Sequence, residues 1–115
     1  MHESACSPHN RATSATNLIT EIRRMRIDAE RIAQAIALPG SEAYQEKLAS
    51  VLDEWIRRGS TRQQLICLAC AAEQGTLDLH ALIIGRQALL NTQDAALHRL
   101  YWACVRRWRH ARSTL

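Results

Sequence analysis

Three cysteines and one histidine have the side-chain chemistry of a metal site. Cys67 and Cys70 form a Cys-x-x-Cys pair, and Cys104 and His110 follow later in the chain. Thiolate and imidazole groups are the usual ligands of a structural zinc ion. The pair lies inside the apolar run L-I-C-L-A-C-A-A, however, which has no glycine or proline to form a zinc knuckle. We therefore predict that the cysteines, Cys6 included, are reduced thiols that act as small hydrophobic residues, and that no metal is bound.

The histidines show no catalytic pattern. His80, His98 and His110 are scattered, without a serine or cysteine partner in a recognisable motif. The sequence also lacks an H-E-x-x-H motif, a glycine-rich phosphate loop and paired carboxylates in an apolar setting. We expect no enzymatic activity and no cofactor.

Arginines gather towards the end of the chain. They have no acidic residue between them and are interleaved with Trp108 and His110; they are Arg99, Arg106, Arg107, Arg109 and Arg112. Arginines beside an aromatic ring can contact phosphates and stack on bases, so a small nucleic-acid-associated regulator is one possible function. The formal net charge is only +4, and no helix-turn-helix sequence precedes the cluster. An acidic protein partner, or stabilisation of a helix end, would explain the same residues.

The composition favours an all-α protein of one domain. The chain has 115 residues, of which 47% are apolar and 4% aromatic, and phenylalanine is absent. A core of leucine, isoleucine and alanine favours helices over strands. No apolar run is long enough to span a membrane, and the first twenty residues lack the pattern of a secretion signal. These features predict a cytoplasmic location, where cysteines stay reduced.

Capping residues and breakers divide the chain into about five helices. Residues 1–16 are polar and without apolar periodicity, which predicts a disordered lead-in before a single helical domain over residues 17–115. We expect the first helix to begin at Asn17 and to stop at Pro39 and Gly40. Ser41 and Gly59 then bound a second helix.

The later helices have clear boundaries too. The Ser60 segment S-T-R-Q is a capping box for a third helix that closes at Gly75. A fourth helix is expected over about 77–90, with Asn91 in the left-handed conformation at its end, and Thr92 or Asp94 opens a fifth. Short connections between five helices predict antiparallel helical hairpins.

An internal repeat of 34 residues supports this arrangement. The segment from 61 to 94 has the length of a tetratricopeptide (TPR) unit, and its large and small positions are occupied by Leu68, Ala69, Ala81 and Ala88. A shift of 34 residues forward reaches Trp102 and Ala103, and a shift backward reaches Gln34 and Ala35. The repeat predicts a TPR-like stack of antiparallel hairpins, and an ordinary helical bundle is the alternative.

Short fragments between residues 42 and 108 resemble a known family. They are Asp53-Glu54-Trp55-Ile56, Leu65-Ile66, Glu73-Gln74-Gly75, Ala95-Ala96-Leu97 and Tyr101-Trp102-Ala103-Cys104, with Trp108. In this order they resemble the TPR-like needle-subunit chaperones of type III secretion, of the YscG and PscG kind. The resemblance implies a cytoplasmic co-chaperone that sequesters a helix of the needle subunit together with a small helical co-chaperone, and so prevents premature polymerisation.

The TPR register also predicts a binding surface. The concave wall of such a stack is lined by fixed positions of each first helix, and most of them are apolar here. The candidate partner-binding residues are Ala29, Ile32, Ile36, Ile66, Cys70, Leu97, Leu100, Cys104 and Trp108. An apolar wall suits an amphipathic helix. The same stripe could instead be the core of a closed bundle.

Overall fold

The computed structural model describes the backbone of residues 8–113 and the side chains of residues 17–113, and within this range the chain is helical without strands. The five helices are α1 (Pro8–Gln34), α2 (Glu42–Arg58), α3 (Thr61–Gln74), α4 (Leu79–Leu89) and α5 (Ala95–Ser113). The predicted all-α class and helix number are confirmed. None of the described helices combines the length and the apolar run needed to cross a membrane.

Local capping signals set most helix boundaries as predicted. The Ser41 hydroxyl accepts a hydrogen bond from the Tyr44 N–H at the start of α2. At α3, the Ser60 hydroxyl accepts from the Gln63 N–H, and the Gln63 side chain accepts from the Ser60 N–H, so both halves of the capping box form. Gly75 ends α3 with φ +75°, a left-handed conformation that favours glycine.

Two predicted boundaries are wrong. α1 begins at Pro8 rather than at Asn17, so the expected disordered lead-in does not hold for residues 8–16, while residues 1–7 lie outside the described range. The end of α4 needs no left-handed Asn91, because the N–H groups of Leu90 and Asn91 donate to the carbonyls of Gln87 and Ala88, three residues back. A tight final turn thus satisfies the carbonyls that a left-handed cap would otherwise satisfy.

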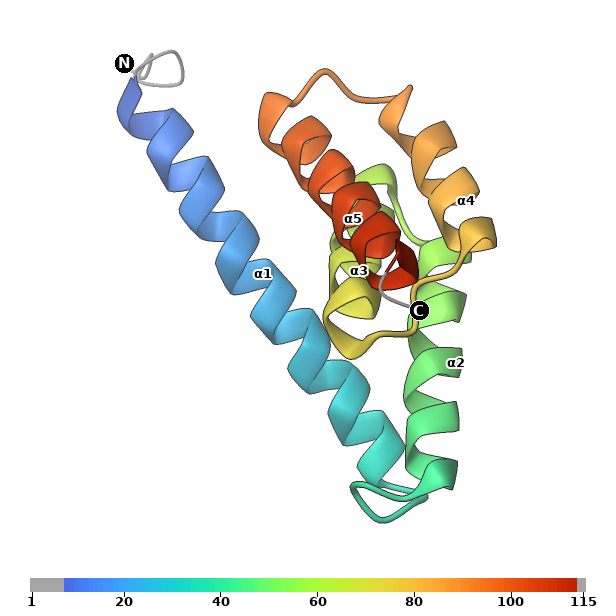
Figure 1. Cartoon of the computed structure of the whole chain (residues 1–115). Helices are drawn as coiled ribbons and strands as arrows, with labels where there is room; N and C mark the ends of the chain where they lie inside the picture. The colour runs from blue at the N-terminus through green and yellow to red at the C-terminus, as the bar shows by residue number, and fades with distance from the viewer. Residues whose placement is uncertain (1–7, 114–115) are drawn as a thin grey trace.

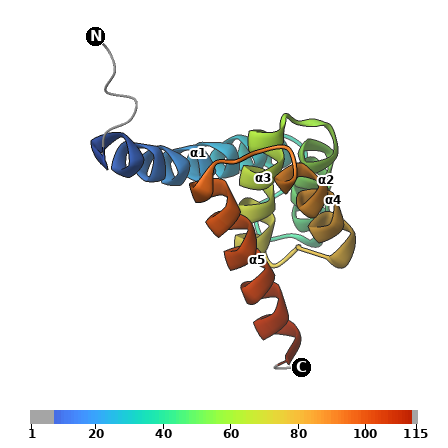
Figure 2. The same cartoon turned by 90° about the horizontal axis from the view of Figure 1, so that it is seen from above.

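The helices form a two-layer stack of antiparallel hairpins. Each helix packs against the next one in the chain; in addition α3 lies between α1 and α5, and α2 lies beside α4 (Figure 1). The view from above shows α1, α3 and α5 in one layer and α2 and α4 in the other (Figure 2). This neighbour pattern confirms the predicted stack of antiparallel helical hairpins. The amino-terminal part of α1 projects past the other helices in both views.

The 34-residue repeat, in contrast, is not fully reflected in the packing. It predicts a small, closely packed residue at the same position of three hairpins, and only one of the three is buried. Ala69 is buried as predicted, but Ala35 and Ala103 are exposed. α1 ends before Ala35, and α5 turns Tyr101 rather than Trp102 towards the core. The residues that let α1 approach its neighbours closely are instead two fully buried alanines, Ala29 and Ala33.

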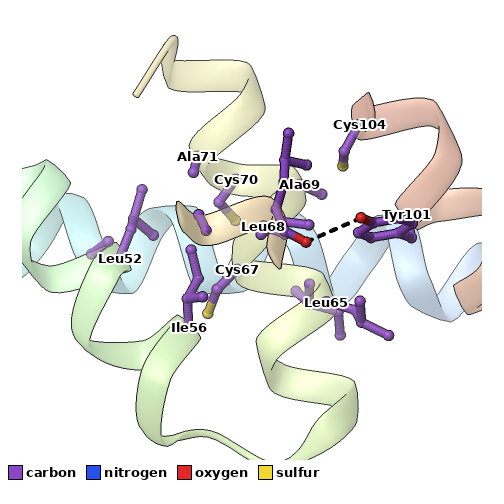
Figure 3. Close-up of a cluster of buried hydrophobic side chains, with 14 of the residues drawn as sticks. Leu52, Ile56, Leu65, Cys67, Leu68, Ala69, Cys70, Ala71, Tyr101 and Cys104 are labelled. Carbon is purple, nitrogen blue, oxygen red and sulfur yellow. Dashed lines mark hydrogen bonds between the residues drawn. The ribbon is translucent and has the colours of Figure 1, made fainter. Parts of the chain in front are cut away.

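α3 is the centre of the core. Seven consecutive residues, 65–71, are buried, so α3 has other helices on nearly every side (Figure 3). Gly85 of α4 lies against Leu68 and Tyr101, and the Tyr101 hydroxyl donates a 3.0 Å hydrogen bond to the Leu82 carbonyl. α4 therefore packs against α3 and α5 mainly through leucine and aromatic side chains.

Candidate functional site

The predicted apolar wall is on α1, α3 and α5, but most of it is not an open surface. The five residues of the set that are buried in the core are Ala29, Ile66, Cys70, Leu97 and Cys104. Leu100 and Trp108 are half-buried against the same core, and only Ile32 and Ile36 are exposed. The prediction of a continuous groove is wrong for the buried five, because α1 and α5 pack directly on α3 and cover its side chains.

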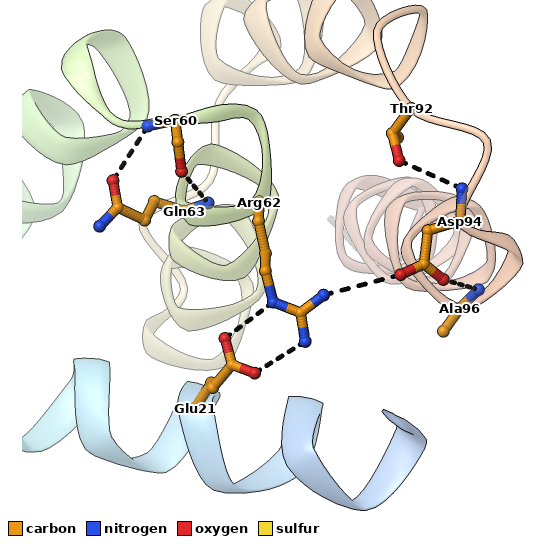
Figure 4. A network of polar contacts seen from close by, with 7 residues as sticks. All are labelled: Glu21, Ser60, Arg62, Gln63, Thr92, Asp94 and Ala96. Carbon is orange, nitrogen blue, oxygen red and sulfur yellow. Dashed lines mark hydrogen bonds and ion pairs between the residues drawn. The ribbon is translucent and has the colours of Figure 1, made fainter. Parts of the chain in front are cut away.

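Polar contacts hold α1 against α3 at two levels. The Arg62 guanidinium donates to both carboxylate oxygens of Glu21, at 2.9 and 2.7 Å (Figure 4). Farther along, Arg26 pairs with Glu73 at 3.5 Å. The Cys70 thiol lies between these ion pairs in the sequence of α3 and donates to the Ile22 carbonyl at 3.4 Å. These contacts oppose any separation of α1 from α3 that would open the wall.

Arg62 also connects α1 to the start of α5. Its guanidinium lies 3.6 Å from Asp94, whose other carboxylate oxygen accepts from the Ala96 N–H (Figure 4). The hydrogen bond from Arg62 lowers the pKa of Glu21 and outweighs the opposing effect of partial burial. One arginine thus links three helices along the edge where they meet.

The three described cysteines lie in apolar surroundings. Cys67, Cys70 and Cys104 are buried free thiols, which confirms their predicted role as small hydrophobic residues. Burial raises the pKa of Cys67 and Cys70 to about 12 and that of Cys104 to about 11. Residues 17–113 contain no group of three or more cysteine, histidine or acidic side chains arranged to hold a metal, and His110 is exposed.

Apart from Ile19 and Ile27 of α1, the large exposed apolar side chains among the described residues lie in two places. The first, the α1 apolar end, consists of Ile32, Ile36 and Leu38; Ile36 and Leu38 are 67% and 79% exposed. Two of these residues belong to the predicted wall, and Leu38 was not predicted. The Leu38 carbonyl accepts hydrogen bonds from the Ser41 N–H and hydroxyl, so the turn that follows α1 holds this leucine at the surface.

The second place, the α4 edge, was missed by sequence reasoning. It consists of Leu79, Ile83, Arg86 and Leu90, which follow one another at helical spacing, together with Trp102 of α5. α4 has apolar residues on more than one face, so helical periodicity by itself does not separate its buried face from its exposed one. The presence of apolar residues on more than one face of this helix could have indicated the surface from sequence, because a helix that is apolar all round needs partners on every side.

The C-terminal arginines point to solvent. Arg99, Arg106, Arg107 and Arg109 are exposed, and the Arg112 guanidinium lies 4.8 Å from the centre of the Trp108 ring. Trp108 in turn lines a small opening of about 130 Å³ with Leu77. The cluster is therefore available to a partner.

Two larger pockets are lined in part by acidic and basic side chains. One of about 410 Å³ lies between α2 and α4 and includes Asp53 and His80, but Asp53 is paired with Arg57 at 3.0 Å. Another of about 360 Å³ lies beside Glu21 and Arg62 and is lined by charged and polar groups of α1 and α3. Among the described residues that line these two pockets, no hydrogen bond joins a serine or threonine hydroxyl to a histidine or a carboxylate.

No protein-family profile, curated protein or solved structure matches this chain. The resemblance to the needle-subunit chaperones stays a prediction that rests on the fragments of sequence given above.

Proposed function

We propose that the protein is a cytoplasmic, non-enzymatic co-chaperone of type III secretion that binds an amphipathic helix of the needle subunit and so prevents its premature polymerisation. The observation that carries the proposal is the α1 apolar end, where Ile32, Ile36 and Leu38 present aliphatic surface to solvent. Aliphatic side chains at a helix end suit the apolar face of another helix. The hairpin-stack fold is compatible with this function, and the family resemblance supplies the client.

The structure changes where the client helix is expected to bind. Five of the nine predicted wall residues are core, so binding does not begin in a preformed groove. The exposed pair Ile32 and Ile36 provides the first contact instead. Burial of about 300 Å² of apolar surface there would contribute on the order of 7 kcal/mol before ordering and association costs, which remove most of it.

Co-expression tests the proposal directly. The full chain is produced together with a type III needle subunit, and soluble needle protein is measured by gel filtration. We expect a complex that keeps the needle subunit soluble, and a Tm that rises with the concentration of needle subunit. The Ile32→Gln/Ile36→Gln variant should keep its helicity and lose the complex. Needle subunit that polymerises equally with and without the chain would refute the function.

Nucleic-acid binding is the second candidate, and the exposed arginines of α5 are the observation that favours it. Phosphate contacts weaken steeply with salt, whereas burial of aliphatic side chains does not. The Arg106→Gln/Arg107→Gln/Arg109→Gln variant should leave the needle complex intact apart from its association rate. An oligonucleotide complex that is abolished by this variant and by moderate salt would favour the regulator instead.

A further inference from the structure

The outer face of α4 is apolar and uncovered within the part of the chain that the structure describes. Leu79, Ile83 and Leu90 are 57%, 53% and 70% exposed, and their spacings of four and seven residues place them on one face of the helix. The opposite face of α4 is already buried through residues such as Leu82 and Leu89. A helix that is apolar on both faces needs a partner on both faces.

Trp102 of α5 extends this surface and is held in place. Trp102 is 41% exposed, and the Arg86 guanidinium lies 5.7 Å from the centre of its ring. The Tyr101 ring packs against it edge to face, with 4.9 Å between the two ring centres. The Tyr101 hydroxyl bonds the Leu82 carbonyl, which couples the α5 aromatic pair to α4. The α4 edge is therefore a preorganised surface that spans two helices, about 16 Å long along α4.

The charge around the α4 edge selects the partner. Between Asp78 and Ser113 the sequence has six arginines and two acidic residues. The Asp78 carboxylate accepts from the Ala81 N–H as the cap of α4, and the Asp94 carboxylate is engaged by Arg62 and the Ala96 N–H, so arginines dominate the charge beside this edge. Arg99 precedes Trp102 by three residues, Arg106 and Arg109 follow it by four and seven, and all three arginines are exposed on the same side of α5. A second copy of the same edge would bring arginines against arginines, which disfavours a symmetric dimer through this face.

We propose that the α4 edge is a second docking surface, which takes an amphipathic helix of another protein with aliphatic residues on one face and Asp or Glu along its flanks. In this complex the partner's aliphatic residues cover Leu79, Ile83 and Leu90, and its carboxylates face the arginines of α5. Phosphate would satisfy the arginines but leave the aliphatic stripe in water, so a helical protein fits better than a nucleic acid. This surface lies on different helices from the α1 apolar end and goes beyond the function proposed above.

Designed peptides test the proposal without knowledge of the natural partner. The probe is a labelled amphipathic helix of about 18 residues with leucines on one face and glutamates on its flanks, matched to one with lysines in place of the glutamates. Fluorescence anisotropy with the full chain measures Kd. We expect the acidic peptide to bind at least about tenfold more tightly than the basic one. Absence of binding by the acidic peptide would overturn the proposal.

Variants locate the binding surface. Ile83→Gln/Leu90→Gln should raise the Kd for the acidic peptide at least about tenfold. The circular dichroism spectrum should not change, since both side chains are exposed. The matched control, Ile19→Gln/Ile27→Gln, removes two exposed isoleucines from α1 and should leave Kd unchanged. Arg99→Glu/Arg106→Glu should reverse the preference between the two peptides. Equal weakening by the α1 control would show nonspecific adhesion and contradict the proposal.

Two further outcomes identify a different occupant. A glutamate-rich peptide without leucines is compared with the leucine-containing one. If it binds equally well and an oligonucleotide displaces it, binding depends only on the negative charge of the ligand, and the helix proposal fails. If light scattering shows a dimer that Ile83→Gln/Leu90→Gln converts to a monomer, the occupant is a second copy. The needle-subunit assay separates the two proposals, because Ile32→Gln/Ile36→Gln should abolish that complex while it leaves peptide binding at the α4 edge intact.

Discussion

Gly85 lies against the Tyr101 ring where α4 meets α5, and a side chain at position 85 would require the Leu68 side chain and this ring to shift. A Cβ built there would lie 2.8 Å from the Leu68 Cδ2 atom and 3.1 Å from the Tyr101 Cε1 atom. Glycine normally weakens a helix, so its presence in the middle of α4 reflects the closeness of this crossing.

Gly85→Ala should therefore destabilise the protein despite the better helix propensity of alanine. Overpacking costs about 1–3 kcal/mol and the propensity gain returns about 1 kcal/mol, so we expect a net loss of about 1 kcal/mol in urea melts, and a larger loss for Gly85→Val. Gln87→Ala, at an exposed position of the same helix, is the control and should be neutral or stabilising. A higher Tm for Gly85→Ala would show that α4 and α5 are farther apart.

Ile66 and Ile36 form a matched pair that separates core from surface. Ile66 is 1% exposed, so Ile66→Asp would bury an unpaired carboxylate and should lower the free energy of unfolding by at least about 3 kcal/mol. Ile36 is exposed, so Ile36→Asp should change the free energy of unfolding by less than about 0.5 kcal/mol. The same substitution should abolish client binding. A folded Ile66→Asp protein that no longer binds would instead restore the open-groove prediction.

The Glu21–Arg62 ion pair predicts a dependence of stability on acid. The folded-state pKa of Glu21 lies below its ordinary value of 4.5, because Arg62 stabilises the carboxylate. Its stabilising contribution is therefore complete above the unfolded pKa and is lost as the pH falls through the lowered, folded one. Glu21→Gln should cost about 1 kcal/mol at neutral pH, since both side chains are about one-third exposed, and nothing at pH values below the folded pKa.

Glu54→Gln is the control for this acid dependence. Glu54 pairs with Arg58 on the exposed face of α2 at 3.1 Å. Because the pair is well solvated, urea melts over a pH series should show little difference from the unmodified protein at any pH. A Glu21→Gln effect as small as that of Glu54→Gln would show that the α1 to α3 link contributes no stability.

The buried thiols should be unreactive in the folded protein. Their raised pKa values, about 12 for Cys67 and Cys70 and about 11 for Cys104, leave almost no thiolate at neutral pH. In a Cys6→Ser background, a chromogenic disulfide reagent should therefore react only at the rate at which the chain unfolds, and immediately in denaturant. Fast reaction of the native protein, or zinc bound at one equivalent, would contradict this arrangement.

The sequence by itself determined the helices and most of their ends. Ser41, Ser60 with Gln63, and Gly75 act through contacts with residues three to five positions away, so they operate before any tertiary packing and can be recognised from spacing alone. The all-α class and the order of hairpins follow from these local signals and from the short connections between them.

Tertiary structure alone decided which apolar faces are buried. Cys70 and Ile36 look alike as members of one predicted wall, yet α1 covers Cys70, whereas Ile36 lies in the turn after α1 and is exposed. Tyr101 rather than Trp102 enters the core because Gly85 leaves room for its ring, a relationship between residues 16 positions apart. Helical periodicity fixes which side chains share a face, but only the crossing of helices fixes which face meets another, and that crossing depends on the shapes of residues distant in sequence.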